Sequence, residues 1–193
     1  MLRRLYDWTL GLAGHRHAMW ALAVVSFAES SVFPVPPDIL LVPMVLAARG
    51  RAWAIAGVCT LASVAGGLAG YGIGYFLFEA VGRPLIEFYG HGARFAEFQA
   101  MYRDWGAWIV AGGGFTPFPY KVITIASGVV ALDPVTFTLA SAVSRGGRFF
   151  IEAALLWYFG PPIRRFVEAN LPLVATLFFV SLIAGLVVAR WLL

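Results

Sequence analysis

The chain has few charged residues and only one cysteine. Asp, Glu, Lys and Arg make up 12% of its 193 residues, whereas 61% are hydrophobic, which is too apolar for an ordinary soluble domain. The lone Cys59 excludes an internal disulfide and a cysteine-rich metal site. The net charge is +4, but no basic run is long enough for an electrostatic nucleic-acid tract. We therefore predict one membrane domain over residues 1–193, with neither nucleic acid nor a metal ion as a partner.

The sequence also lacks the usual catalytic signatures. The three histidines lie outside the long apolar segments, and no Ser-His-Asp or HExxH arrangement occurs. No phosphate-binding GxxxxGK[ST] loop is present either. We expect no enzymatic activity and no cofactor.

Two apolar stretches are each broken by a pair of prolines, followed by one charge. The corresponding residues are Pro34, Pro36 and Asp38 in the first half and Pro117, Pro119 and Lys121 in the second. Proline removes a backbone donor and disfavours helical geometry in the residue before it, so neither stretch can be one continuous spanning helix. A broken helix at membrane depth is tolerated only against protein or a water-filled cavity. Both stretches are therefore predicted to be re-entrant helical hairpins.

Segment lengths give the remaining organisation of an all-α integral membrane protein. A hydrocarbon core of about 30 Å needs about 20 residues of helix, and three apolar runs reach that length. The predicted elements are an amphipathic N-terminal helix, hairpins at 18–48 and 106–134, spanning helices at 52–78, 135–160 and 171–193, and an extracytoplasmic amphipathic segment at 79–105. The last segment could equally be a helical linker packed on its own protein.

Arginines are distributed unevenly along this topology. If both hairpins return to the side they left, one face receives Arg3, Arg4, Arg16, Arg49, Arg51, Arg164 and Arg165. The positive-inside rule makes that face cytoplasmic and predicts a cytoplasmic N-terminus.

Six ionisable side chains fall inside apolar segments, where a charge is expensive. They are Glu29, Asp38, Lys121, Arg145, Arg148 and Glu152. Arg145, Arg148 and Glu152 share one helix face by their spacing, so three acids could face three bases. Lys121, Arg145 and Arg148 are candidate contacts for a phosphate headgroup, and Glu29 and Asp38 are candidates for proton exchange. Glu152 and the four prolines would support this site, while a purely structural alternative is that the six charges only neutralise one another.

At these residues the chain resembles the DedA family of membrane proteins, also called VTT or SNARE-associated domains, and is most similar to its YqaA-like branch. The segments that carry the resemblance are Phe27-Ala28-Glu29, Pro36-Pro37-Asp38, the glycine-rich stretch from Gly66 to Gly74, Thr116-Pro117-Phe118-Pro119-Tyr120-Lys121, and Ser144-Arg145-Gly146-Gly147-Arg148-Phe149-Phe150. The resemblance implies two opposed hairpins related by an inverted repeat, with an essential acidic pair at Glu29 and Asp38. It also places Gly114 and Lys121 where many members carry arginines.

The same resemblance implies a lipid translocase of the bacterial inner membrane, in which a phosphate headgroup crosses the protein while its tail stays in lipid. Undecaprenyl phosphate is the first expected substrate, with proton coupling as an added expectation. A phosphatidylethanolamine or general phospholipid scramblase is the alternative within this class. A proton-coupled small-solute transporter and a membrane assembly factor are alternatives from other classes. The expected partners are membrane lipids, with a homo-oligomer left open.

Overall fold

The computed structural model describes residues 17–169, apart from residues 34, 83, 85–91 and 117–118. Every regular element within these ranges is helical, so the all-α prediction is confirmed. The N-terminal helix, Pro34, Pro117 and the helix at 171–193 were predicted for positions outside the described residues.

Six α-helices and two short helical turns follow one another along the described chain. They are α2 (Ala18–Ser31), α3 (Asp38–Ala47), the 3-10 turn η1 (Arg49–Arg51), α4 (Ala52–Leu77), the π-helical turn η2 (Phe78–Gly82), α6 (Gly92–Phe115), α7 (Tyr120–Val129) and α8 (Pro134–Ala169). Local chemistry explains several of these ends. Pro119 precedes the first residue of α7, and Pro134 begins α8, where a missing N–H costs nothing. The exposed Asp133 accepts a 2.7 Å hydrogen bond from the Thr136 N–H, and this bond lowers the pKa of its carboxyl.

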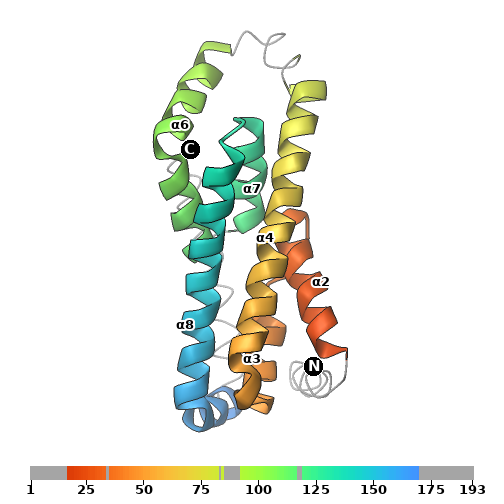
Figure 1. Ribbon diagram of the computed structural model, residues 1–193, viewed down its shortest axis with the longest axis vertical. Coiled ribbons are helices and arrows are strands. Elements are labelled where there is room, and N and C mark those ends of the chain that lie inside the picture. Colours follow the sequence, from red (N-terminus) through yellow and green to blue (C-terminus); the bar gives the residue numbers. More distant parts are fainter. Residues whose placement is uncertain (1–16, 34, 83, 85–91, 117–118, 170–193) are drawn as a thin grey trace.

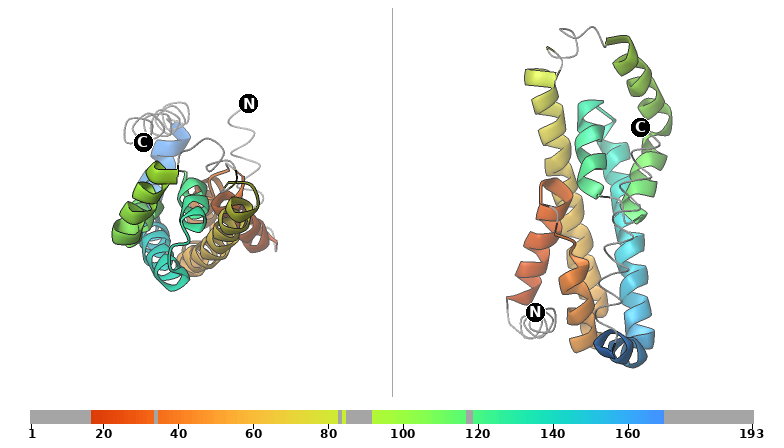
Figure 2. Two further views of the ribbon diagram at one scale, coloured as in Figure 1. Left: turned by 90° about the horizontal axis from the view of Figure 1, so that it is seen from above. Right: turned by 180° about the vertical axis from the view of Figure 1, so that it is seen from behind.

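Two helix pairs approach the middle of the elongated molecule from opposite ends (Figure 1). From one end, α2 rises beside α4 and α3 returns; from the other, α6 descends and α7 returns. The view from behind in Figure 2 shows the same arrangement, with α4 and α8 running past both pairs. The chain reversals that contain the proline segments therefore lie near one another at mid-height.

Glycines in α4 allow this close approach. A Cβ added to Gly66 would lie 2.1 Å from the Phe27 carbonyl oxygen on α2, and one added to Gly74 would lie 2.0 Å from that of Ile125 on α7. Only glycine fits at such backbone contacts, as small residues do in membrane helix packing. Gly72 meets nothing within 4 Å, so the glycine stretch is not uniformly a packing surface.

Two apolar clusters form the core, one on each side of the middle. The first joins buried residues of α2, α3, α4 and the later part of α8, including Phe149. The second joins residues of α6, α7 and the start of α8, including Tyr120 and Phe137. The region between the two clusters is where the buried charges gather.

Arg49 connects η1 to the far part of α8. Its Nη2 donates to the carbonyl oxygens of Trp157 and Tyr158, the latter at 3.4 Å. In an α-helix these carbonyls would accept from residues 161 and 162, but both are prolines and have no N–H. Arg49 thus donates to carbonyl oxygens that have no N–H partner within α8.

The helices differ from the predicted elements in two places. We predicted a boundary between residues 105 and 106, but α6 runs unbroken from Gly92 to Phe115, because no proline interrupts it before the second reversal. We also predicted about three spanning helices. Within the described residues only the stretch Arg49–Leu77 is both long and apolar enough to cross a membrane. Helix α8 is longer, but it carries Arg145, Arg148 and Glu152.

Candidate functional site

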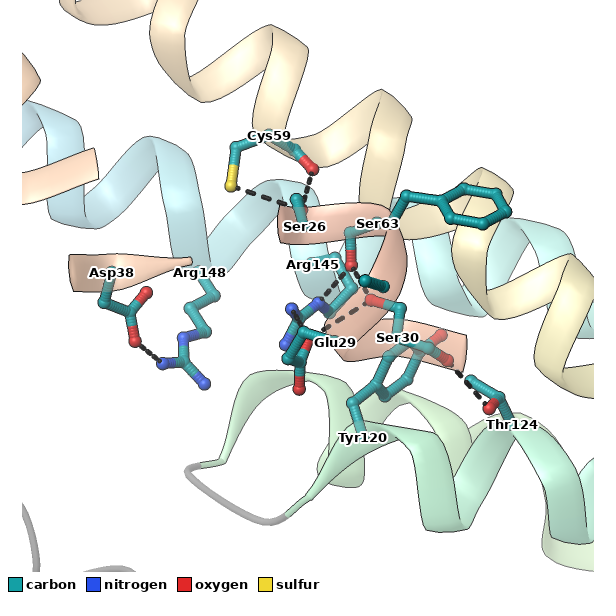
Figure 3. Close-up of polar contacts among 12 residues, drawn as sticks. Ser26, Glu29, Ser30, Asp38, Cys59, Ser63, Tyr120, Thr124, Arg145 and Arg148 are labelled. Carbon is teal, nitrogen blue, oxygen red and sulfur yellow. Dashed lines mark hydrogen bonds and ion pairs between the residues drawn. The ribbon is translucent and has the colours of Figure 1, made fainter. Parts of the chain in front are cut away.

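Among the described residues, the most deeply buried charge belongs to Arg145 on α8, which is 2% exposed. Its Nη2 donates to Glu29 Oε2 on α2 at 2.8 Å, and its Nε donates to Ser63 Oγ on α4 at 2.7 Å (Figure 3). Ser30 Oγ lies 2.7 Å from Ser63 Oγ and donates to Glu29 Oε2 at 3.2 Å. The ion pair is therefore part of a closed hydrogen-bond network that joins three helices.

Two aromatic rings enclose the same guanidinium group. The Arg145 Cζ lies 4.8 Å from the ring centroid of Tyr120 and 4.6 Å from that of Phe149. A desolvated cation over such faces gains cation–π attraction. Since Phe149 belongs to the first apolar cluster and Tyr120 to the second, Arg145 lies between the two halves of the core.

Arg148 makes the second ion pair, one turn further along α8. Its Nη2 donates to Asp38 Oδ2 at 2.5 Å, and its Nη1 donates to the Thr116 carbonyl oxygen at 3.2 Å. Asp38 begins α3 after the first proline segment, and Thr116 follows α6 at the start of the second. One side chain thus bridges both chain reversals. The pair is more open than the first, with Arg148 23% exposed.

Polar side chains and glycines of three helices, α2, α4 and α7, hold the chain reversals against one another. Thr124 Oγ1 on α7 donates to the Ser30 carbonyl oxygen at 3.1 Å. A Cβ added to Gly70 on α4 would lie only 2.4 Å from the same Thr124 Oγ1, so the glycine leaves room for this contact. Ser63 was not among the predicted site residues. It could have been found as a hydroxyl on the packing face of α4, since Gly66, Gly67 and Gly70 follow it three, four and seven residues later.

Lys121 and Glu152 do not make the ion pairs that three acids facing three bases would require. Lys121 lies in the first turn of α7, half-buried, and no acidic side chain among the described residues pairs with it. Glu152, one turn beyond Arg148, lies against Asp38, another acid. The expected three-to-three pairing is therefore wrong: among the described residues these six side chains form two ion pairs, Lys121 has no acidic partner, and the Glu152 carboxyl interacts with another carboxyl. Pro36 and Pro119 flank the described reversals, whereas Pro34 and Pro117 are outside the described residues.

The charged groups of this centre can be considered by what each could bind. Within the described part of the chain, no group of three or more His, Cys, Asp or Glu could hold a metal ion. Cys59 is buried, and Ser26 Oγ donates to its carbonyl oxygen at 2.8 Å. An ammonium without an acidic partner among the described residues, a partly exposed guanidinium and a pair of carboxyls can bind an anion and exchange a proton.

The fold and the charged centre define a class of helical protein in which two opposed helix pairs meet around two ion pairs. No protein-family model and no solved structure matches the chain. An uncharacterized protein of Haemophilus influenzae is 34% identical over 168 residues, covering 85% of this chain and 87% of its own. An uncharacterized protein of Histophilus somni is 32% identical over 156 residues, or 81% of each chain. The chain belongs to the family of these two proteins.

Proposed function

We propose that this protein is an integral protein of the bacterial inner membrane that translocates a lipid with a phosphate headgroup, with undecaprenyl phosphate as the first candidate. The observation that carries this proposal is a charged centre, reached from opposite ends by two broken helix pairs, in which Lys121 has no acidic partner among the described residues. The resemblance to the DedA family supports the same function. In this reading the helix pairs are opposed re-entrant hairpins of an inverted repeat, an arrangement in which transporters commonly place their sites.

The outer surface supports a lipid environment. Large apolar side chains point outward along α4 and α8, and Leu61 and Val143 are 75% and 73% exposed. Soluble monomers rarely expose contiguous apolar patches beyond a few hundred Å². Several tryptophans are also exposed, among them Trp53 and Trp157, whose rings lie tilted to each other with centroids 6.4 Å apart. Tryptophan is enriched at membrane interfaces.

The same end of the molecule supports a cytoplasmic orientation. Figure 1 places the start of α4 and the end of α8 together, and Arg49 links them. Arg51 lies in the same turn, and Arg164 and Arg165 lie in the last part of α8. By the positive-inside rule this end faces the cytoplasm.

Lys121 and Arg148 are the two cations that would bind the phosphate headgroup. Arg145 is enclosed by rings and fully engaged with Glu29 and Ser63, so we assign it to holding the helices together. Arg148 is 23% exposed, and Lys121 has no acidic partner among the described residues. A phosphate could replace the Thr116 carbonyl as acceptor from Arg148, while Lys121 adds a charge-assisted hydrogen bond.

The proposal is tested with purified protein in liposomes that contain labelled undecaprenyl phosphate, under a pH gradient. An added phosphatase reports which headgroups have reached the outer leaflet. We expect faster exposure than in protein-free liposomes, and a loss of about tenfold in Lys121→Ala, since one charge-assisted hydrogen bond is worth about 1.5 kcal/mol or more. Lys121→Arg should keep much of the rate, and Arg51→Ala, which removes an exposed arginine away from the site, is the matched control.

Other outcomes assign the function differently. Equal rates with and without protein would contradict lipid translocation. Faster movement of labelled phosphatidylethanolamine than of undecaprenyl phosphate would assign a phospholipid scramblase. Uptake of a small soluble anion without lipid movement would assign a solute transporter.

A further inference from the structure

Asp38 is incompletely satisfied, although it forms an ion pair. Its Oδ2 accepts the 2.5 Å hydrogen bond from Arg148. Its Oδ1 is fully buried and receives no hydrogen bond from any described residue. Burying a carboxylate oxygen without a hydrogen-bond donor is unfavourable, so its place here needs an explanation.

The neighbour of Asp38 supplies one. Glu152 is half-buried on α8, four residues after Arg148 and therefore on the helix face that meets Asp38, and its carboxyl interacts electrostatically with that of Asp38. Two ionised carboxylates have no hydrogen to share, whereas one protonated carboxyl donates to the other. Like charges in contact inside a protein cannot both ionise at little cost, as in carboxyl dyads that hold one proton between them.

The positive charge around Asp38 and Glu152 is enough to balance one ionised carboxyl but not two. Arg148 and Arg145 are the cations that act on Glu152, both from α8. Arg145 is already neutralised by Glu29. From α4 the ionisable neighbour is the Cys59 thiol, which brings no positive charge, and α6 contributes only the Thr116 carbonyl to Arg148. One guanidinium is thus left for two carboxyls.

We propose that Asp38 and Glu152 share one proton and form the proton-binding site of this protein. The inference deepens the proposed function, because the proton site then adjoins Arg148, one of the two cations assigned to the headgroup. When the shared proton leaves, Glu152 becomes a second negative charge beside Arg148 and competes with a bound phosphate. When the proton returns, Arg148 is again available, which couples proton release to headgroup release.

Infrared spectroscopy of the full-length protein in detergent tests the shared proton without any transport assay. A protonated carboxyl gives a C=O band distinct from that of a carboxylate. We expect this band at neutral pH in the wild type, its loss as the pH rises, and its absence in Glu152→Gln. The glutamine amide can donate to Asp38 Oδ1 as the protonated acid does, so this variant should fold. Glu29→Gln is the matched control and should keep the band.

A band that survives in Glu152→Gln, or disappears only in Glu29→Gln, would overturn the proposal. Liposome transport tests the coupling separately: Glu152→Gln should flatten the dependence of the rate on pH, and a wild-type pH profile would contradict it. If the wild type moves no lipid but the infrared band behaves as described, the proton site stands and the proposed function fails.

Discussion

The Glu29–Arg145 and Asp38–Arg148 pairs have the same chemistry and lie one helical turn apart on α8, yet their surroundings differ. Arg145 is 2% exposed and is held by the Glu29 carboxylate, the Ser63 hydroxyl and two aromatic rings. Arg148 is 23% exposed, and its partner Asp38 keeps an unsatisfied oxygen. A closed network resists change, because breaking it strands a buried charge. An open pair with a proton-sharing neighbour can change state, so we assign structure to the first pair and function to the second.

The largest effect on stability should come from removing the acid of the closed pair. Glu29→Ala leaves the Arg145 guanidinium buried without a counter-ion, which costs roughly 3–5 kcal/mol. Asp38→Ala makes the same change beside the more exposed Arg148, and we expect about 1 kcal/mol. Thermal unfolding in detergent measures both. Similar losses in the two variants would show that the pairs do not differ as described.

A smaller effect is expected when the closed network loses a hydroxyl but keeps both charges. Ser63→Ala removes the acceptor of Arg145 Nε and the partner of Ser30 Oγ, which should cost about 1.5–3 kcal/mol. The control is Thr60→Ala on the same helix, since Thr60 Oγ1 donates only to the Ala56 carbonyl of its own helix. Unfolding midpoints that fall equally in both variants would remove Ser63 from the network.

The smallest of the three effects should follow from displacing α2 without removing any polar group. Gly66→Ala puts a methyl group against the Phe27 carbonyl, two residues before Glu29, and should cost about 1–3 kcal/mol. Gly72→Ala meets open space and should leave stability unchanged or slightly raised. A neutral Gly66→Ala would mean that α2 is not held at this contact.

Much of the fold follows from local sequence rules. The proline segments lie between the end of α2 and the start of α3, and between the end of α6 and the start of α7, where clustered prolines disfavour a continuous helix. The glycines of α4 indicate close helix contacts, although sequence alone does not separate Gly66 from Gly72. The continuation of α6 through residues 105 and 106 was missed, because a change in polarity along a helix is not a break in its backbone.

The candidate residues could be predicted from the cost of burying charge, but their pairing could not. Spacing places Arg145, Arg148 and Glu152 on one face, and they do lie on successive turns of α8. Which acid meets which arginine depends on how α2 and α3 rest against α4 and α8, and this is tertiary information. Asp38 and Glu152 are both acids, so a prediction that pairs opposite charges would not have brought them together.

The most direct test compares lipid translocation per folded molecule in Glu29→Gln and Asp38→Asn, measured in liposomes and normalised by the folded fraction. We expect Glu29→Gln to unfold at a lower temperature but to retain translocation in the molecules that fold. Asp38→Asn should unfold near the wild-type temperature and lose translocation. Full translocation in Asp38→Asn, or its loss in a Glu29→Gln protein of wild-type stability, would contradict the assignment of structure to one pair and function to the other.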